Sequence, residues 1–133
     1  MTLDFANVDW LAVIIATVAG LVIGFVWYAP PVFGRRWAKA AGVELGNPAP
    51  TVYIGSVIAT LVAAAVLAVL AASVAVANIV DGAILGALVA VGLVAPWAAM
   101  QWLYERRSVE WFGINAGYAL VALTVMGAII GYF

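Results

Sequence analysis

The side chains that could do chemistry in this sequence are few and are not the usual catalytic types. The chain has no Cys and no His, so it lacks a thiolate nucleophile, the commonest general base and the usual haem and zinc ligands. Two side chains with an amide group lie inside strongly apolar stretches. Gln101 lies four residues before Glu105, and Asn115 lies five residues after Glu110, so both are about one helical turn from a charged residue.

Aromatic residues gather around these two polar side chains. Most of the Trp, Tyr and Phe residues lie near the same charged segments, although an interfacial aromatic belt should appear on both sides of a membrane. Polar groups at that depth should face protein or water, because exposure to hydrocarbon is costly. We therefore predict a vestibule that opens toward the basic loops; hydrogen bonding between helices is the alternative. The predicted lining residues are Tyr28, Trp97, Gln101, Asn115 and Tyr118. No catalytic, cofactor-binding or metal-binding residue is predicted.

The elements that must position these side chains are membrane helices. Of the 133 residues, 68% are hydrophobic and 8% are charged, against roughly a quarter charged in soluble domains. One domain of this size cannot hide so much apolar surface from water, so membrane lipids are its expected surroundings. The net charge of −1 gives no electrostatic case for binding nucleic acid.

Four stretches without charged residues are long enough to cross a membrane, which takes about 20 apolar residues. None of them alternates polar and apolar residues as a barrel strand would. The sequence therefore predicts an all-α, polytopic four-transmembrane-helix bundle that forms a single domain over residues 1–133. The predicted helices cover about residues 10–29, 51–76, 82–103 and 111–132. Asp81 is expected to cap the third of them.

The basic residues are confined to two loops, which four crossings place on the same side of the membrane. The positive-inside rule makes that side cytoplasmic, with the N-terminus and the C-terminus outside. The residues are Arg35, Arg36 and Lys39 in the first loop and Arg106 and Arg107 in the second.

The first basic loop contains a short amphipathic segment. If the segment is helical, Phe33 and Trp37 share one face while Arg35 and Lys39 point away. This pattern is typical of a short helix lying in the membrane interface, and Gly42 would end it. An irregular loop with the same residues is the alternative.

Glycines four residues apart recur along the chain. Small residues at this spacing let a second helix approach closely, and close contact drives helix association in lipid. Several helices carry such stripes, so we expect a homo-oligomer, although packing within one chain would use them equally well. The pairs are Gly20 and Gly24, Gly82 and Gly86, Gly113 and Gly117, and Gly127 and Gly131, while the second helix carries Gly55, Ala59 and Ala63 at the same interval.

Pro96 lies inside the third predicted helix. It removes a backbone N–H, and its ring clashes with the carbonyl of Gly92 one turn earlier, so a kink is expected there. The kink could serve as a hinge for gating or could be a static bend.

The segment in which the first helix ends resembles the signature of a known family. Residues 27–37 read Trp-Tyr-Ala-Pro-Pro-Val-Phe-Gly-Arg-Arg-Trp, and Gly42 follows. Together with the stretch from Ile114 to Ile129, this motif is similar to the domain of unknown function 1761 family, small membrane proteins of bacteria, archaea and some fungi. The second proline is a departure from the family pattern. The resemblance implies a four-helix integral membrane protein, here of a prokaryotic inner (plasma) membrane, and implies no substrate, cofactor or catalytic residue.

Three classes of function remain open. The leading hypothesis is a non-enzymatic, homo-oligomeric membrane module, such as a small pore, carrier or accessory subunit that uses the vestibule. The second is a protein or enzyme that binds a lipid or lipophilic molecule at the inner membrane interface, and the third is a structural interaction partner. No predicted span holds an ionisable group deep in the membrane, which argues against a proton-coupled transporter.

Overall fold

The computed structural model describes residues 2–46 and 48–133, and this part of the chain is helical without strands. Four of its helical stretches are long and apolar enough to cross a membrane, which confirms the predicted fold class. The helices are α1 (Trp10–Trp27), α2 (Arg35–Ala41), α3 (Pro50–Ser73), α4 (Ile79–Val89), α5 (Ala95–Tyr104) and α6 (Val109–Tyr132), with π-helical turns η1 (Pro30–Gly34) and η2 (Ala90–Val94).

Side-chain caps fix where the helices begin. The Asp9 carboxylate accepts two backbone N–H groups of the first turn of α1, and the Ser108 hydroxyl accepts one at the start of α6. The cap of α4 differs from the prediction. The Asn78 side chain accepts the Asp81 N–H and donates to the Asp81 carboxylate, so Asp81 lies in the first turn of α4. The helix therefore starts one turn earlier than predicted, because Asn78 satisfies the free amide.

The third membrane-spanning stretch changes its hydrogen bonding near its middle. The Ala95 N–H donates to the Ala90 carbonyl, five residues back, across η2. Pro96 follows immediately and cannot donate a hydrogen bond itself. At the place where a kink is predicted from Pro96, the helix thus has a π-helical turn that precedes the proline.

Helices α4 and α6 pack so closely that their backbones touch. A Cβ atom on Gly82 would collide with the Gly127 carbonyl, and one on Gly86 would collide with the Leu123 carbonyl. Gly131 is equally crowded by the start of α4. Two of the predicted glycine pairs therefore pack against each other within the chain, as small-residue stripes do in membranes.

The buried core joins α1, α3 and α6. Val13, Leu67 and Met126 are its largest fully buried side chains, one from each helix. Gly20 makes room for the core methionine, because a Cβ there would lie 2.9 Å from the Met126 sulfur. The small residues of α1 thus face its neighbours and its larger ones face outward.

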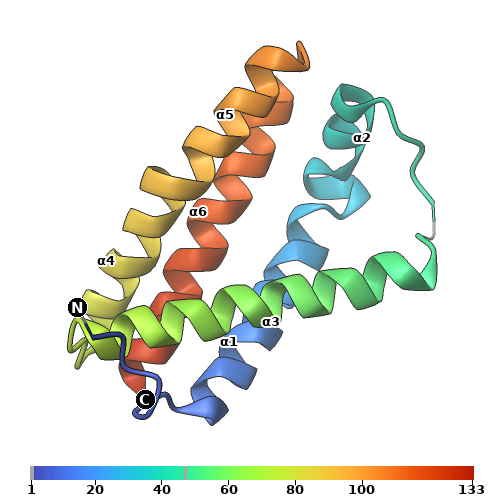
Figure 1. Ribbon diagram of the computed structural model, residues 1–133. Helices are drawn as coiled ribbons and strands as arrows, with labels where there is room; N and C mark the ends of the chain where they lie inside the picture. The colour runs from blue at the N-terminus through green and yellow to red at the C-terminus, as the bar shows by residue number, and fades with distance from the viewer. Residues whose placement is uncertain (1, 47) are drawn as a thin grey trace.

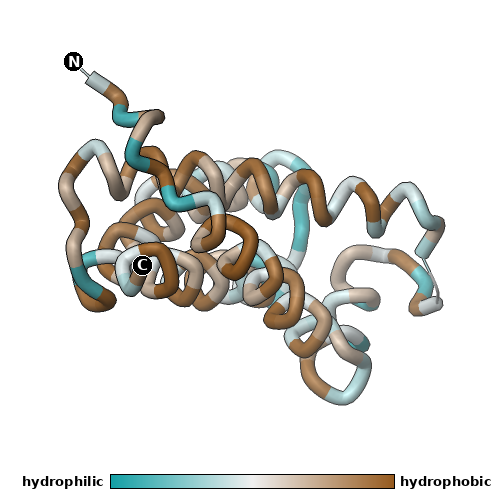
Figure 2. The backbone as a smooth tube through the Cα atoms, turned by 90° about the horizontal axis from the view of Figure 1, so that it is seen from below, coloured by the Kyte–Doolittle hydropathy of each residue, from teal (hydrophilic) through white to brown (hydrophobic). Residues whose placement is uncertain are grey.

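Helix α3 crosses α1 obliquely, and its first half leaves the other helices (Figures 1 and 2). Its second half contributes Ala64 and Leu67 to the core. In contrast, every residue from Pro50 to Ala59 is exposed. One contact of this half with α1 is an aromatic stack between Phe25 and Tyr53, whose ring centroids are 6.3 Å apart.

Helix α1 ends level with the second turn of α6. The indole N–H of Trp27, the last residue of α1, donates to the Ile114 carbonyl over 2.9 Å. Residues 109–113 of α6 therefore extend beyond α1, and α2 packs beside α6 there (Figure 1).

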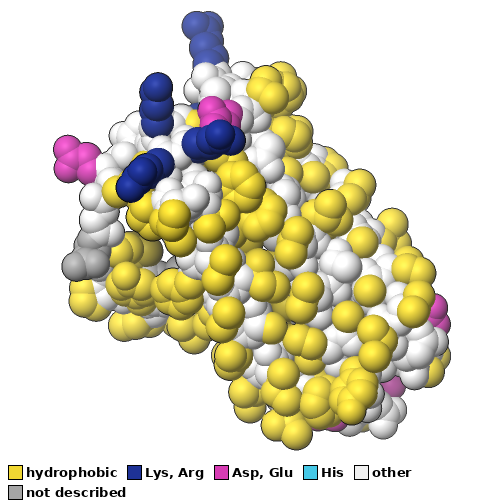
Figure 3. Space-filling view, turned by 180° about the vertical axis from the view of Figure 1, so that it is seen from behind, with side chains coloured by type: hydrophobic (Ala, Val, Ile, Leu, Met, Phe, Trp, Pro, Cys, Tyr) yellow, Lys and Arg dark blue, Asp and Glu magenta, His cyan; other side chains and the backbone are white. Residues whose placement is uncertain are grey.

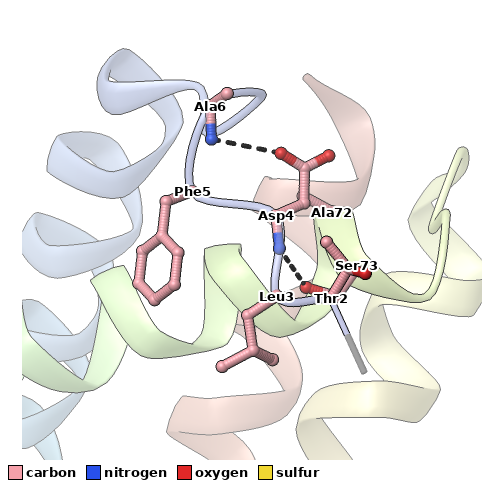
Figure 4. Close-up of a pocket in the computed structure, with 7 residues that line it drawn as sticks. All are labelled: Thr2, Leu3, Asp4, Phe5, Ala6, Ala72 and Ser73. Carbon is pink, nitrogen blue, oxygen red and sulfur yellow. Dashed lines mark hydrogen bonds between the residues drawn. The ribbon is translucent and has the colours of Figure 1, made fainter.

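At the opposite end, the N-terminal segment folds over the end of α3. The Asp4 N–H donates to the Ser73 hydroxyl over 2.8 Å. The Asp4 carboxylate accepts the backbone N–H of Asn7 at 3.0 Å and its side-chain N–H at 2.8 Å. Figure 4 shows Leu3 and Phe5 pointing away from that carboxylate, beside a shallow hollow of about 520 Å³.

Candidate functional site

The motif at residues 27–37 folds back on itself directly after α1. Ala29 is extended, as expected before a proline, and Pro30 begins η1. The turn brings Gly34 against the carbonyl of Tyr28, where any Cβ atom would collide. Glycine is therefore required at this position by a close backbone approach, and the turn lets α2 start beside the end of α1.

Aromatic side chains pair across this turn. Trp27 packs on Phe33 with ring centroids 4.8 Å apart, and Tyr28 meets Trp37 edge to face at 5.5 Å. Edge-to-face and offset geometries are the favoured ones for aromatic rings. The predicted apolar residues Phe33, in η1, and Trp37, in α2, therefore face the end of α1 and are half-buried there.

Hydrogen bonds join this motif to α6. The Tyr28 hydroxyl donates to the side-chain oxygen of Asn115 over 2.6 Å. The Tyr118 hydroxyl donates to the Gly20 carbonyl over 3.0 Å, and its ring meets that of Tyr28 edge to face at 5.4 Å. We call this cluster the aromatic seam, defined by Trp27, Tyr28, Trp37, Asn115 and Tyr118. Its hydroxyl groups are used in holding α1 to α6, as expected for polar groups in a medium of low polarity.

The structure divides the five predicted lining residues into two groups. Tyr28, Asn115 and Tyr118 meet in the aromatic seam, whereas Trp97 and Gln101 lie exposed on α5. The Trp97 side chain is 68% exposed. Two hollows at the surface of the described residues lie at the other end of the molecule, one beside the N-terminal segment and one between the start of α4 and the end of α6.

The remaining glycines of the predicted pairs have two different surroundings. Gly24 makes room for the Tyr118 hydroxyl, which would lie 3.1 Å from an added Cβ. Gly117 makes room for the Trp27 ring in the same way, at 3.0 Å. In contrast, Gly113 has nothing within 4 Å of an added Cβ. Close packing of aromatic rings, rather than of a second backbone, explains glycine at the first two positions.

Charged side chains tie α2 to the start of α6. Arg36 lies 3.7 Å from the Glu110 carboxylate, an exposed pair that contributes little by itself. The Arg107 guanidinium donates to the Ala41 carbonyl over 3.0 Å and lies over the Trp111 ring at 5.7 Å. A cation at the carboxyl end of α2 satisfies a free carbonyl there.

The predicted hinge residues lie on the outer side of the third spanning stretch. Gly92 and Pro96 are exposed, and a Cβ on Gly92 would meet nothing within 4 Å. The far end of α5 is held as well, because Trp102 stacks on Phe112 of α6 at 5.2 Å. The end of α5 that lies beyond the predicted hinge is therefore in contact with the start of α6.

Comparison with protein families gives one match. A family model described as "Protein of unknown function (DUF1761)" matches residues 11–131. Comparisons with curated proteins and with solved structures found no match. Within the described residues, no three His, Cys, Asp or Glu side chains gather in a way that could hold a metal ion. The matched region includes the aromatic seam and all but the first and last residues of the four membrane-spanning stretches, and the chain belongs to the DUF1761 family of proteins of unknown function.

Proposed function

We propose that this protein is a non-enzymatic membrane module that acts through helix association, as a homo-oligomer or an accessory subunit. The hydrogen bonds within the aromatic seam support this function over a pore, a carrier or an enzyme at that surface. Tyr28 and Tyr118 direct their hydroxyl groups to acceptors on the neighbouring helix, rather than to an open cavity.

The observation that carries the proposal is the exposed stripe of small residues on α3. Within the chain, small residues spaced four apart let α4 and α6 touch, as at Gly82 and Gly127. The same spacing recurs on α3 at Gly55, Ala59 and Ala63, and these three residues are exposed. A second copy that docks on this stripe would gain the same close contact, which is the main source of helix association in lipid.

Cysteine cross-linking in native membranes tests this proposal, and the chain offers a Cys-free background. A two-fold axis along the membrane normal brings the same residue of both copies together. We expect Ala59→Cys to form a disulfide-linked dimer on mild oxidation. Val57→Cys is the matched control, because it is also exposed but lies on the opposite side of α3.

A second variant separates association from chance collision. Ala59→Leu should abolish cross-linking through a cysteine at Gly55, since the larger side chain blocks close approach. Equal cross-linking at Ala59 and Val57, or cross-linking that persists beside the leucine, would reject self-association through α3.

The proposal includes an orientation, with the basic end of the molecule in the cytoplasm of a prokaryote and both termini outside. The clustering of Lys and Arg at one end of an otherwise largely hydrophobic surface supports it (Figure 3). A cysteine at Leu45, in the loop before α3, should be protected from an impermeant thiol reagent in intact cells. A cysteine at Ala77, in the turn before α4, should react; the reverse result would invert the topology.

A further inference from the structure

The outward surface of α2 is cationic because its apolar side is already occupied. Phe33 and Trp37 pack on Trp27 and Tyr28, and Ala38 is buried. An amphipathic helix that lies flat in a membrane needs its apolar face free to enter lipid. Because Phe33 and Trp37 are half-buried against the protein, the outward contact of α2 with a membrane would be made mainly by its cationic side chains.

Two cations on that outward surface are not engaged by the protein. Arg36 is paired with Glu110, whereas Arg35 and Lys39 are exposed and have no carboxylate within 4.0 Å in the described ranges 2–46 and 48–133. Residues four apart on a helix have Cβ atoms about 5–6 Å apart, on one face. The two side chains can therefore approach one phosphate group together.

Their position along the membrane normal matches that of lipid headgroups. Trp27 and Tyr28 end the first spanning helix, and such residues favour the membrane–water boundary. Arg35 and Lys39 follow within a turn and a short helix. Val32, 44% exposed, precedes them in the chain and offers an apolar contact at the boundary.

We propose that the outward face of α2 binds the headgroup of an anionic phospholipid, with its phosphate between Arg35 and Lys39. The pairing of cationic side chains with an anionic headgroup identifies the partner. The packed inner face holds α2 in place, so the two cations need no refolding to bind. This proposal does not depend on self-association, since each copy carries the whole surface.

Lipid titration of the purified protein tests the site. Phosphatidylglycerol and phosphatidylcholine would be titrated into the protein in a neutral detergent, and bound lipid counted per protomer by native mass spectrometry. We expect a preference for phosphatidylglycerol that falls about fivefold for each cation removed in Arg35→Gln and Arg35→Gln/Lys39→Gln. The Arg35→Lys/Lys39→Arg variant preserves both charges and should keep the preference for phosphatidylglycerol. This result would show that substitution at the two positions does not disrupt the fold.

The matched control is Arg106→Gln in the other basic loop. Like Arg35, Arg106 is exposed and has no carboxylate partner within the described residues, so this variant also removes one exposed positive charge. It should leave the preference unchanged. If Arg35→Gln and Arg106→Gln lowered the preference for phosphatidylglycerol equally, net charge would explain the effect, and the proposed site between Arg35 and Lys39 would be rejected. The proposal would also fail if the double variant kept its preference, or if millimolar inorganic phosphate displaced the lipid completely.

Discussion

The Tyr28 hydroxyl lies 2.6 Å from the side-chain oxygen of Asn115, and this hydrogen bond joins residues 87 positions apart in the chain. It connects the end of the first spanning helix to the start of the last. Both residues belong to the two stretches through which the sequence resembles its family. The two halves of the family pattern are therefore parts of one structural cluster.

Removing this hydrogen bond should weaken the joint between α1 and α6. We expect Tyr28→Phe and Asn115→Leu each to destabilise the protein by about 1 kcal/mol, with a coupling near 0.5–1.5 kcal/mol in the double variant. Unfolding in a denaturing detergent, followed by circular dichroism, measures both quantities. Tyr132→Phe, at a side chain that is 70% exposed, should change nothing.

Gly127→Ala should be strongly destabilising, because the new Cβ would collide with the Gly82 carbonyl of α4. A backbone cannot move aside as a flexible side chain can, so we expect a loss of about 3 kcal/mol. Gly92→Ala is the contrasting variant, since its Cβ meets nothing within 4 Å. Gly92→Ala should stabilise the protein by about 0.5 kcal/mol, because alanine has a higher helix propensity than glycine. Unfolding in a denaturing detergent measures the stability of both variants.

Gly34→Ala should disturb the turn rather than a helix. The added methyl would meet the Tyr28 carbonyl, so η1 would have to open and separate Trp37 from Tyr28. We expect a cost of about 2 kcal/mol and a red shift of the tryptophan emission. Unchanged emission would show that the turn can open without affecting the aromatic seam.

Arg107→Ala should loosen α2 without unfolding the bundle. It removes the hydrogen bond to Ala41 and the contact with Trp111, at a cost of about 1 kcal/mol. Hydrogen exchange of the α2 amides should become faster, while exchange in α4 stays the same. Arg106→Ala is the control, and an equal effect there would point to net charge.

Acid should release the N-terminal segment. Hydrogen bonds from the Asn7 side chain, then from its backbone, lower the pKa of the Asp4 carboxyl. Because the folded pKa is the lower one, the stabilisation is present above the ordinary pKa of about 4 and is lost as the pH falls through the folded value. Limited proteolysis near residues 2–7 should increase below that pH. Asp4→Asn should remove this pH dependence.

Hydropathy was sufficient to predict the four spanning stretches, because crossing a membrane requires a long apolar segment wherever its neighbours lie. Periodicity left a helix and an irregular loop as alternatives for the first basic loop; the structure has a helix at Arg35–Ala41, and Gly42 ends it with a positive φ of 70°. These properties depend on residues close together in the sequence. The cap at Asn78 was missed because Asp81 also suits a helix start.

The partners within the aromatic seam could not be predicted from the sequence in the same way. Gln101 and Asn115 were assigned the same depth, and depth does not determine which way a helix face turns. Packing of Gly82 and Gly86 on α6 sets the rotation of α4, and the turn η2 then leaves Trp97 and Gln101 on the outer side of α5. A signal was present in Gly24 and Gly117, whose partners proved to be the aromatic rings Tyr118 and Trp27.

The lengths of α1 and α6 determine which bilayer this protein fits. With a rise of 1.5 Å per residue, the 18 residues of α1 cover about 27 Å, while the 24 residues of α6 cover about 36 Å. The hydrocarbon core of an ordinary bilayer is about 30 Å thick. Residues 109–113, which pass the end of α1 beside α2, account for most of this difference, so the parts of α1 and α6 that cross the hydrocarbon are of similar length. Hydrophobic mismatch would thin the lipid around α1.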